Sequence, residues 1–399
     1  MFAVLSAARK RLRLPRILRL AVASFGVLAL AACEPIQFGG VGAGDNTGQR
    51  INTDNPVPVA LLLPKSDAGA SGVAQALENA ARLAVADLDG VRIDLRVYDT
   101  AGNAGQAAAQ AQKAVDEGAK IILGPLFGEA ANAVGVAVSD DNVNVLSFSN
   151  NPSIAGGNVF VLGPTFRNTA NRLLGYAARN GKSTVAIVYP NNVEGQFGKA
   201  AIESAAGTNG LRVTAAESFE FSQAGVLNAM PRIAAAARQS DAVFLTSNAA
   251  GALPLLVQLL PENGIAPDTT QYIGLARWDV PPQTLALPGV QGGWFALPDQ
   301  ARTASFNSRY QGAYGTSPHP LAGLAFDGIA AIGALVAQGK SDALTRGALT
   351  QTAGFQGVGG VFRLRPDGTN ERALAVASVR GNKVVILDPA PKAFGGAGF

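Results

Sequence analysis

A stretch of about thirty residues, 121–152, constrains the fold of this chain more than any other part of its sequence. It contains a short apolar run at 121–123, a run of small apolar residues at 130–138, and a second apolar, β-branched run at 143–146. This pattern predicts a strand, a helix and a strand in succession. Such a unit joins two parallel neighbouring strands through a right-handed crossover.

Both strand ends of this unit are expected at the carboxyl edge of a sheet, where open α/β sheets bind ligands. The turn Gly124-Pro125 follows the first strand, and the polar tract 147–151 follows the second. The hydroxyl and amide groups of this tract can contact a ligand or cap the following turn, and the sequence leaves both roles open. The candidate cleft residues of the tract are Ser147, Ser149, Asn150 and Asn151.

The same alternation of apolar strands and amphipathic helices continues along the chain. Further strands are predicted at 57–63, 91–98, 159–162, 185–189, 211–221, 242–246, 272–275, 293–297, 360–364, 373–379 and 384–387. Further helices are predicted at 73–87, 104–117, 169–180, 198–207, 225–238, 252–260, 305–314, 321–338 and near Leu344. Two α/β wraps separated by the turn at 163–165 predict two similar lobes. The long helical segments after residue 305 predict a return of the chain to cover the first lobe.

The start of the chain is typical of a secreted lipoprotein. A basic segment precedes an apolar run at 20–30, which is too short to span a bilayer and typical of a signal peptide. The run ends in Leu30-Ala-Ala-Cys33, which resembles a bacterial lipobox, so Cys33 is predicted to carry a lipid. Glu34 then favours, by resemblance, the periplasmic face of the outer membrane of a Gram-negative bacterium. The alternative is an incidental cysteine after an ordinary signal peptide.

The basic character of the chain belongs to this leader. Six basic residues and no acid precede residue 33, and subtracting these six charges from the net charge of +4 leaves −2 for the rest. A nucleic-acid partner is therefore not expected.

Catalytic, metal and cofactor sites are not predicted. The single histidine, His319, lies between two prolines, and the chain has too few Cys and His residues for a zinc site. Neither a nucleophile elbow nor the spacing of a phosphate loop is present. The chain is expected not to be an enzyme.

Ten short segments carry a family resemblance. They are 61–64, 98–100, 119–125, 151–152, 188–191, 241–245, 310–315, 325–327, 355–360 and 362–368. In this order they resemble the type I periplasmic binding proteins of the leucine/isoleucine/valine-binding kind. The resemblance implies an α/β fold of two Rossmann-like lobes with parallel sheets, three inter-lobe crossings and a cleft of strand-end loops. The implied divisions are a signal peptide at 1–32, a flexible tether at 33–56, lobe I at 57–163 plus 298–350, lobe II at 164–297 plus 351–388, and a tail at 389–399.

The positions that bind amino acids in this family are altered here. A hydroxyl residue that holds the substrate carboxylate is replaced by Phe127 or Gly128, and Ala276 stands where the ammonium needs a carboxylate. Glu194 replaces an aromatic residue that closes the cleft. Burying an ammonium without a carboxylate costs several kcal/mol. An ordinary amino-acid ligand is therefore not expected.

Arg277 and Trp278 follow the altered acid position and are further cleft candidates. They could hold an anion or a stacked group, or Arg277 could bridge the lobes to Glu194. We favour the bridge, because complementary charges would stabilise a closed cleft without a ligand.

Within this fold, the loop 147–151 combined with a lipobox resembles the penicillin-binding protein activators. The resemblance implies an outer-membrane lipoprotein that binds and stimulates a class A peptidoglycan synthase, without a cofactor. The alternative is the solute-binding subunit of an ABC importer for amino acids or amides, with an ABC permease and a small amino-acid-like ligand as partners.

Overall fold

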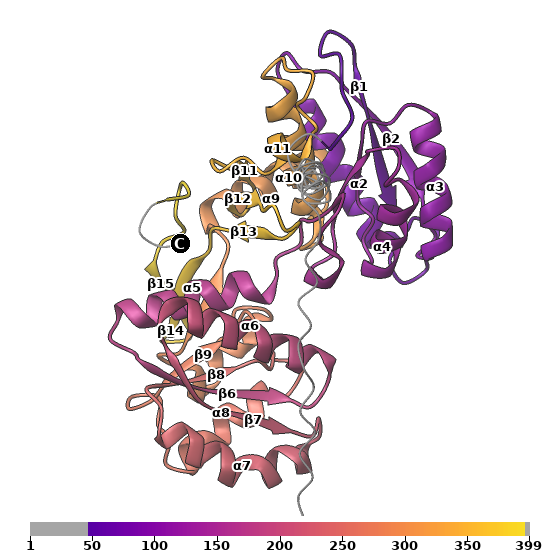
Figure 1. Ribbon diagram of the computed structural model, residues 1–399. Helices are drawn as coiled ribbons and strands as arrows, with labels where there is room; N and C mark the ends of the chain where they lie inside the picture. The colour runs from indigo at the N-terminus through magenta and orange to yellow at the C-terminus, as the bar shows by residue number, and fades with distance from the viewer. Residues whose placement is uncertain (1–46, 396–399) are drawn as a thin grey trace, which may run out of the picture. The chain divides into compact units, whose positions relative to one another are not determined.

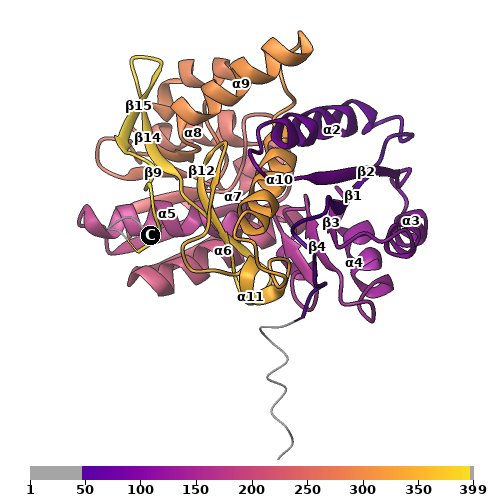
Figure 2. The same cartoon turned by 90° about the horizontal axis from the view of Figure 1, so that it is seen from above.

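The computed structural model describes residues 47–395, which all belong to one compact unit. The predicted signal peptide, Cys33 and the first part of the predicted tether lie outside the described residues. Two β-sheets, each covered by helices on both faces, account for most of the described chain (Figures 1 and 2). No helix within residues 47–395 has the length and apolarity needed to cross a membrane.

Lobe I contains a five-stranded parallel sheet in the order β2-β1-β3-β4-β5. The strands are β1 (Val57–Leu63), β2 (Ile93–Asp99), β3 (Ile121–Leu123), β4 (Asn144–Ser147) and β5 (Val159–Val161). The helices on one face are α2 (Ser71–Ala86), α9 (Gln300–Tyr314) and α10 (Ala322–Val336), and those on the other are α3 (Ala104–Asp116) and α4 (Gly128–Ala137). The packing of α10 against α2 and β3 confirms the predicted helical return to the first lobe.

The apolar run of β1 explains why this strand lies inside the sheet. Val59, Leu61 and Leu63 point into the core beneath α2 and α10. Ala60 and Leu62 point into the core beneath α3 and α4. A strand covered on both faces needs apolar residues at every position rather than at alternate ones.

Lobe II contains a seven-stranded sheet in the order β15-β14-β10-β9-β8-β6-β7. The strands are β6 (Thr184–Pro190), β7 (Arg212–Phe219), β8 (Ala242–Leu245), β9 (Gln271–Gly274), β10 (Trp294–Leu297), β14 (Ala375–Arg380) and β15 (Lys383–Asp388). The helices on one face are α5 (Phe166–Arg179) and α6 (Val193–Asn209), and those on the other are α7 (Gln223–Arg238) and α8 (Leu253–Glu262). Two short 3₁₀ helices, η2 (Pro282–Ala286) and η3 (Pro288–Val290), precede β10.

The predicted two-lobed α/β fold is confirmed, with one difference in lobe II. The strands β14 and β15 run antiparallel to their neighbours, so this sheet is mixed rather than purely parallel. The two strands are joined by a two-residue turn in which Gly381 and Asn382 both have positive φ. Such turns match the twist of a hairpin, which places β15 at the edge of the sheet.

A small antiparallel sheet of β11 (Phe355–Gly357), β12 (Gly360–Leu364) and β13 (Asn370–Arg372) was only partly predicted. Phe355 and Phe362 belong to the core of lobe I, whereas Val361 belongs to the core of lobe II. Residues 351–364 therefore contact both lobes. The predicted division at residue 350, which assigned them to lobe II alone, does not describe them.

The last part of the predicted flexible tether is fixed to lobe I, so that prediction is wrong for residues 47–56. The Ile51 N–H donates to the Ser341 carbonyl (2.9 Å), and the Ile51 side chain joins the lobe I core. The Thr47 carbonyl accepts from the N–H of Arg346, the first residue of α11 (Arg346–Leu349), and from the Asn144 side chain. Sequence alone missed these bonds because they join segments far apart in the chain.

Candidate functional site

The strand-end loops of lobe I meet at the carboxyl edge of its sheet, as the opening stretch of the sequence predicted. The strands β3 and β4 are parallel neighbours, so the turn after β3 lies beside the loop after β4. Gly128, the first residue of α4, is close to this loop: a Cβ atom there would lie 3.4 Å from Ser149 Oγ and 3.5 Å from Asn151 Nδ2. Phe127 precedes it and is 40% exposed.

The polar groups of loop 147–151 mostly bond to one another. The Ser147 hydroxyl donates to the Pro125 carbonyl (3.0 Å) and accepts from the Ser149 N–H (3.1 Å). The Ser149 hydroxyl accepts from the Asn151 N–H (3.1 Å). Asn151 Oδ1 accepts from the N–H of Ser153 (2.9 Å), at the start of the 3₁₀ helix η1 (Pro152–Ile154). Of the two roles left open by the sequence, these bonds favour turn capping.

On the lobe II side, Glu194 lies in the first turn of α6. Asn192 caps this helix, because its side chain accepts from the Gly195 N–H (2.8 Å). The cap explains why α6 begins at Val193 rather than at the predicted residue 198. A carboxylate in the first turn interacts favourably with the helix dipole.

The predicted bridge from Arg277 to Glu194 is wrong. Arg277 instead pairs with Asp279, with Nε 2.9 Å from Oδ1 and a terminal guanidinium nitrogen 2.6 Å from Oδ2. An acid two residues away in the same turn satisfies the guanidinium without any movement of the lobes. Arg277 therefore has a local partner.

Trp278 is not a cleft residue. Its side chain is fully buried in the core of lobe II and stacks on Phe295, with ring centroids 6.1 Å apart. Gly274 and Gly293 make room for it, since a Cβ atom at either position would lie 2.2–2.3 Å from an atom of the indole. The role of Trp278 is packing, and the prediction of a stacked ligand there is wrong.

One cavity brings part of the predicted set together. It has a volume of about 620 Å³ and contains Asn150, Asn151 and Glu194 in its wall. Phe127, Gly128, Ser147, Ser149, Arg277 and Trp278 are not in this wall. The remaining wall comprises Pro152, Thr165, Phe166, Arg167, Val193, Phe197, Ala200, Ala201, Ser204 and Thr369.

Most of that wall was missed by sequence reasoning. Val193, Phe197 and Ala201 recur every four residues along one face of α6, and this stripe faces the cavity instead of the sheet. One signal was available in the sequence. The large apolar residues Val193 and Phe197 stand next to the polar residues Glu194 and Gln196, a pattern that is unusual for the buried face of a helix.

Large apolar side chains are exposed around the strand-end edges of both lobes. We call the following residues the exposed rim: Phe127, Val193, Phe197, Phe221 and Val280. They follow β3, β6, β7 and β9, and Val193 is the most exposed at 72%. Within residues 47–395, no three His, Cys, Asp or Glu side chains are grouped to hold a metal ion. The described edge is therefore apolar with isolated polar groups.

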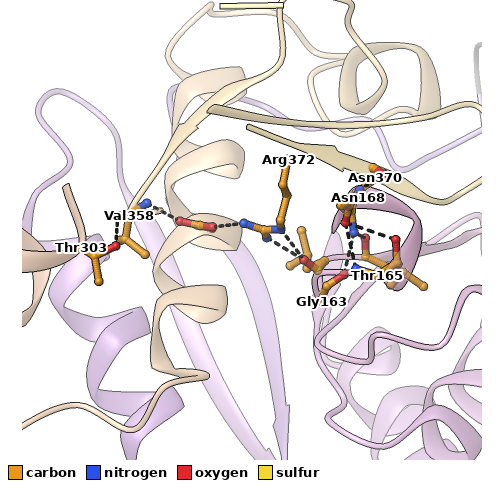
Figure 3. Close-up of polar contacts among 10 residues, drawn as sticks. Gly163, Thr165, Asn168, Thr303, Val358, Asn370 and Arg372 are labelled. Carbon is orange, nitrogen blue, oxygen red and sulfur yellow. Dashed lines mark hydrogen bonds and ion pairs between the residues drawn. The ribbon is translucent and has the colours of Figure 1, made fainter. Parts of the chain in front are cut away.

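The junction between the lobes is held by a buried polar network (Figure 3). Arg372 pairs with Asp327 of α10 (2.8 Å) and donates twice to the Leu162 carbonyl, at 3.0 and 2.6 Å. The second oxygen of Asp327 accepts from the Val358 N–H (2.8 Å). Burial raises the pKa of the Asp327 carboxyl, while the Arg372 guanidinium acts in the opposite direction.

Asn370 extends this network to the first crossing between the lobes. Its Nδ2 donates to the carbonyls of Val161 (2.7 Å) and Gly163 (2.9 Å), and its own carbonyl accepts from Asn168 Nδ2 (2.9 Å). The second crossing, near Asp299, is bonded to the third, because the Asp299 N–H donates to the Gly359 carbonyl (2.8 Å). The three crossings are thus tied to one another by hydrogen bonds.

Comparison with solved structures finds proteins of similar fold. A putative branched-chain amino acid ABC transporter protein from Rhodospirillum rubrum is 21% identical, with a TM-score of 0.71, over 84% of this chain and 100% of that one. A branched-chain amino acid ABC transporter periplasmic ligand-binding protein from Burkholderia xenovorans LB400 is 18% identical, with a TM-score of 0.66, over 84% and 96%. A solute-binding protein from Rhodopseudomonas palustris BisB5, in complex with 3,4-dihydroxybenzoic acid, is 17% identical, with a TM-score of 0.56, over 84% and 98%.

Sequence comparison gives the family directly. No curated protein matches the chain. The periplasmic binding protein family matches residues 56–383, which is most of the chain and includes both lobes. The chain belongs to the periplasmic binding protein family.

Proposed function

We propose that this protein is a lipid-anchored interaction domain that binds and activates a class A penicillin-binding protein, a peptidoglycan synthase. In this proposal Cys33 carries the lipid, and the protein stands at the periplasmic face of the outer membrane. It is a binding protein and not an enzyme, and it needs no cofactor.

The exposed rim is the observation that carries this proposal. Large apolar side chains that gather on one side of a protein surface are typical of sites where another protein docks. Val193 and Phe221 are 72% and 61% exposed. Burying such side chains against a partner contributes about 1.5–3 kcal/mol each.

The polar groups of the edge give weaker support to an amino-acid ligand. The hydroxyls of Ser147 and Ser149 are engaged within their own loop. Ala276 offers no carboxylate to an ammonium group. A zwitterion bound at this edge would have to pair with Glu194 and Arg167, the charged residues of the cavity wall, instead of with an acid at position 276.

The test uses the full-length lipoprotein in detergent, added to a purified class A synthase. Binding is measured by interferometry, and stimulation is measured as the rate of glycan polymerisation. Val193→Ser is expected to weaken binding about tenfold, because the apolar contact of one buried valine is lost. Val136→Ser is the matched control, since Val136 is 71% exposed at the far end of α4.

Binding that is equally weak or equally tight for both variants would refute the rim as the docking surface. Absence of both binding and stimulation by the wild-type protein would refute the proposed partner.

Solute binding for an ABC importer is the second candidate, supported by the cavity of about 620 Å³. This volume lies in the range of small-molecule sites. The dihydroxybenzoic acid in the Rhodopseudomonas palustris relative has no ammonium group, so a ligand of that class would not need an acid at position 276. Calorimetry with leucine, isoleucine, benzoate and 3,4-dihydroxybenzoate distinguishes the candidates. Micromolar binding of any of them would favour transport.

A further inference from the structure

The outward face of α6 is made of apolar and small residues. Five exposed residues follow one another on this face at alternating intervals of four and three residues: Val193, Phe197, Ala200, Ser204 and Gly207. We call these five residues the outer stripe. The residues that α6 buries lie on the other side of the helix: Gly195, Gly198, Ile202, Ala205 and Ala206.

An uncharged outward face is unusual for a surface helix. A helix that buries one side against a sheet normally places charged residues on the other side. The helix α7, which covers the other face of the same sheet, follows this rule with Arg232 and Arg238 exposed (Figure 1). The charged residues of α6, which are Glu194, Lys199 and Glu203, flank the outer stripe and do not belong to it. The alternating spacing is that of a helix that packs along its length against a second helix.

The described chain does not supply this second helix. Within residues 47–395, α6 packs mainly against α5, β6 and β7. Val193 is 72% exposed and Phe197 is 47% exposed, so none of these elements covers the outer stripe. Four of the five stripe residues instead belong to the wall of the cavity of about 620 Å³ described above. Space for a helix is therefore open along the stripe.

The order of side-chain sizes along the stripe indicates what this helix is. The large residues Val193 and Phe197 come first, and the small residues Ala200, Ser204 and Gly207 follow. Two antiparallel copies of the stripe place the large half of each copy against the small half of the other. Phe197 then lies opposite Ala200 of the other copy, and Val193 lies opposite Ser204. Two parallel copies would set Phe197 against Phe197 and leave a void between the small residues.

The residues that flank the stripe are compatible with the antiparallel arrangement. In this register Glu203 lies beside Gln196 of the other copy, and Glu194 lies beside Ala201. Like charges therefore do not meet across the contact. Glu203 keeps its pairing with Lys199 of its own helix (2.8 Å).

We infer that α6 packs against α6 of a second copy of this chain, antiparallel across a two-fold axis, and that the outer stripe is the interface. Two-fold symmetry is the commonest symmetry of homo-oligomers, and it needs only one self-complementary surface. The helix has 17 residues, so the contact is about 25 Å long and places the dimer in the weak class.

The dimer and the proposed synthase use overlapping surfaces. Val193 and Phe197 belong both to the outer stripe and to the exposed rim. A second copy and a synthase therefore exclude each other at α6. The inference of the dimer does not depend on the synthase, because it follows from α6 alone.

Cysteine crosslinking of the full-length protein in detergent tests the interface, since Cys33 is the only natural cysteine. Ala200→Cys places a thiol close to the two-fold axis. With a short bis-maleimide it is expected to give a covalent dimer in about fivefold higher yield than the unsubstituted chain, because the dimer holds the two thiols at a high effective concentration. Val136→Cys is the matched control, exposed on α4 and expected to stay at the background.

Two further variants establish the direction of the helices. Val193→Cys and Ser204→Cys are each expected to stay at the background alone, because in an antiparallel pair each thiol is roughly 16 Å along the helix axis from its counterpart. A mixture of the two proteins is expected to crosslink, since Val193 of one copy lies opposite Ser204 of the other.

A charge in the stripe is expected to separate the copies. Phe197→Asp, added to Ala200→Cys, is expected to return the dimer yield to the background, because it replaces two apolar contacts by two carboxylates close to the axis. Circular dichroism of this variant checks that the chain is folded.

A yield for Ala200→Cys no higher than that for Val136→Cys would overturn the interface. Equal self-crosslinking of Val193→Cys and Ala200→Cys would overturn the antiparallel arrangement. Crosslinking of Ala200→Cys to an added class A synthase, without crosslinking to itself, would assign the stripe to the synthase and overturn the dimer.

Discussion

Replacing Arg372 with methionine removes the cation that pairs with Asp327 while keeping an unbranched side chain. The substitution breaks one ion pair of 2.8 Å and two hydrogen bonds to the buried Leu162 carbonyl. Asp327 is 1% exposed and retains only the bond from the Val358 N–H. Removing one partner of a buried ion pair lowers the free energy of unfolding by about 3–5 kcal/mol.

This cost can be expressed as a change in melting temperature. Unfolding entropy is about 2.1 cal/mol/K per residue, so for the described residues 47–395 the loss corresponds to a decrease of about 4–7 °C in Tm. Urea unfolding followed by tryptophan fluorescence gives the free energy of unfolding directly. The double variant Asp327→Asn, Arg372→Met keeps the acceptor for Val358 and removes the buried charge. It is expected to recover about 1–3 kcal/mol of the loss.

The pH dependence of Arg372→Met separates a buried charge from a mere packing defect. Burial already raises the pKa of Asp327, and the variant lacks the guanidinium that opposes this effect. A carboxyl whose pKa is raised in the folded state gains stability as the pH falls through that pKa. The deficit of Arg372→Met is therefore expected to narrow between pH 7 and pH 5. A deficit below about 1 kcal/mol at pH 7, or one that is constant with pH, would refute the reasoning.

Three further perturbations follow from the same structure. Hydrogen bonds led by that from a backbone N–H lower the pKa of Asp241 to about 2. Asp241→Asn should cost about 1 kcal/mol at pH 7, and its urea curve should converge with the wild-type curve as the pH falls from about 4 toward 2. Trp278→Ala should lower the free energy of unfolding by about 3–5 kcal/mol, whereas Arg277→Ala should change it by no more than about 0.5 kcal/mol. Similar losses for the two variants would contradict the burial of Trp278 and the exposure of Arg277. Asn144→Ala should lower the free energy of unfolding by about 1–3 kcal/mol, because it removes the donor to the Thr47 and Leu344 carbonyls. Proteolysis at residues 47–56 should become faster, and an unchanged rate would show that other contacts hold this segment.

The fold was predictable because its signals are local and periodic. The apolar run of β1 matches the predicted strand residue for residue, and β3 likewise. Such runs require burial on both faces whatever the rest of the chain does. The strands β11 and β13 were missed because, unlike the equally short β3, neither Phe355–Gly357 nor Asn370–Arg372 forms an apolar run.

The site was less predictable, because its residues could satisfy their hydrogen bonds in more than one way. The tract 147–151 offers the same hydroxyls to a ligand or to its own backbone, and only the folded loop shows that the backbone takes them. Trp278 beside Arg277 looked like a recognition pair, but Gly274 and Gly293, on two neighbouring strands or next to them, create the space that buries the indole. Non-local packing of this kind leaves no periodic trace in the sequence.

The lobe junction shows where a usable signal was present and unused. Asp327 is the single charged residue between positions 321 and 338, within an otherwise apolar helix. A lone acid on a buried helix needs a cationic partner, so its presence predicts an ion pair. Three arginines follow on the hairpin, at 363, 365 and 372. Arg363 and Arg365 are two residues apart on one face of β12 and its extension, and both pair with Glu371 on the facing strand. Once the pairing of Glu371 is known, strand alternation places its neighbour Arg372 on the opposite face, where it pairs with Asp327.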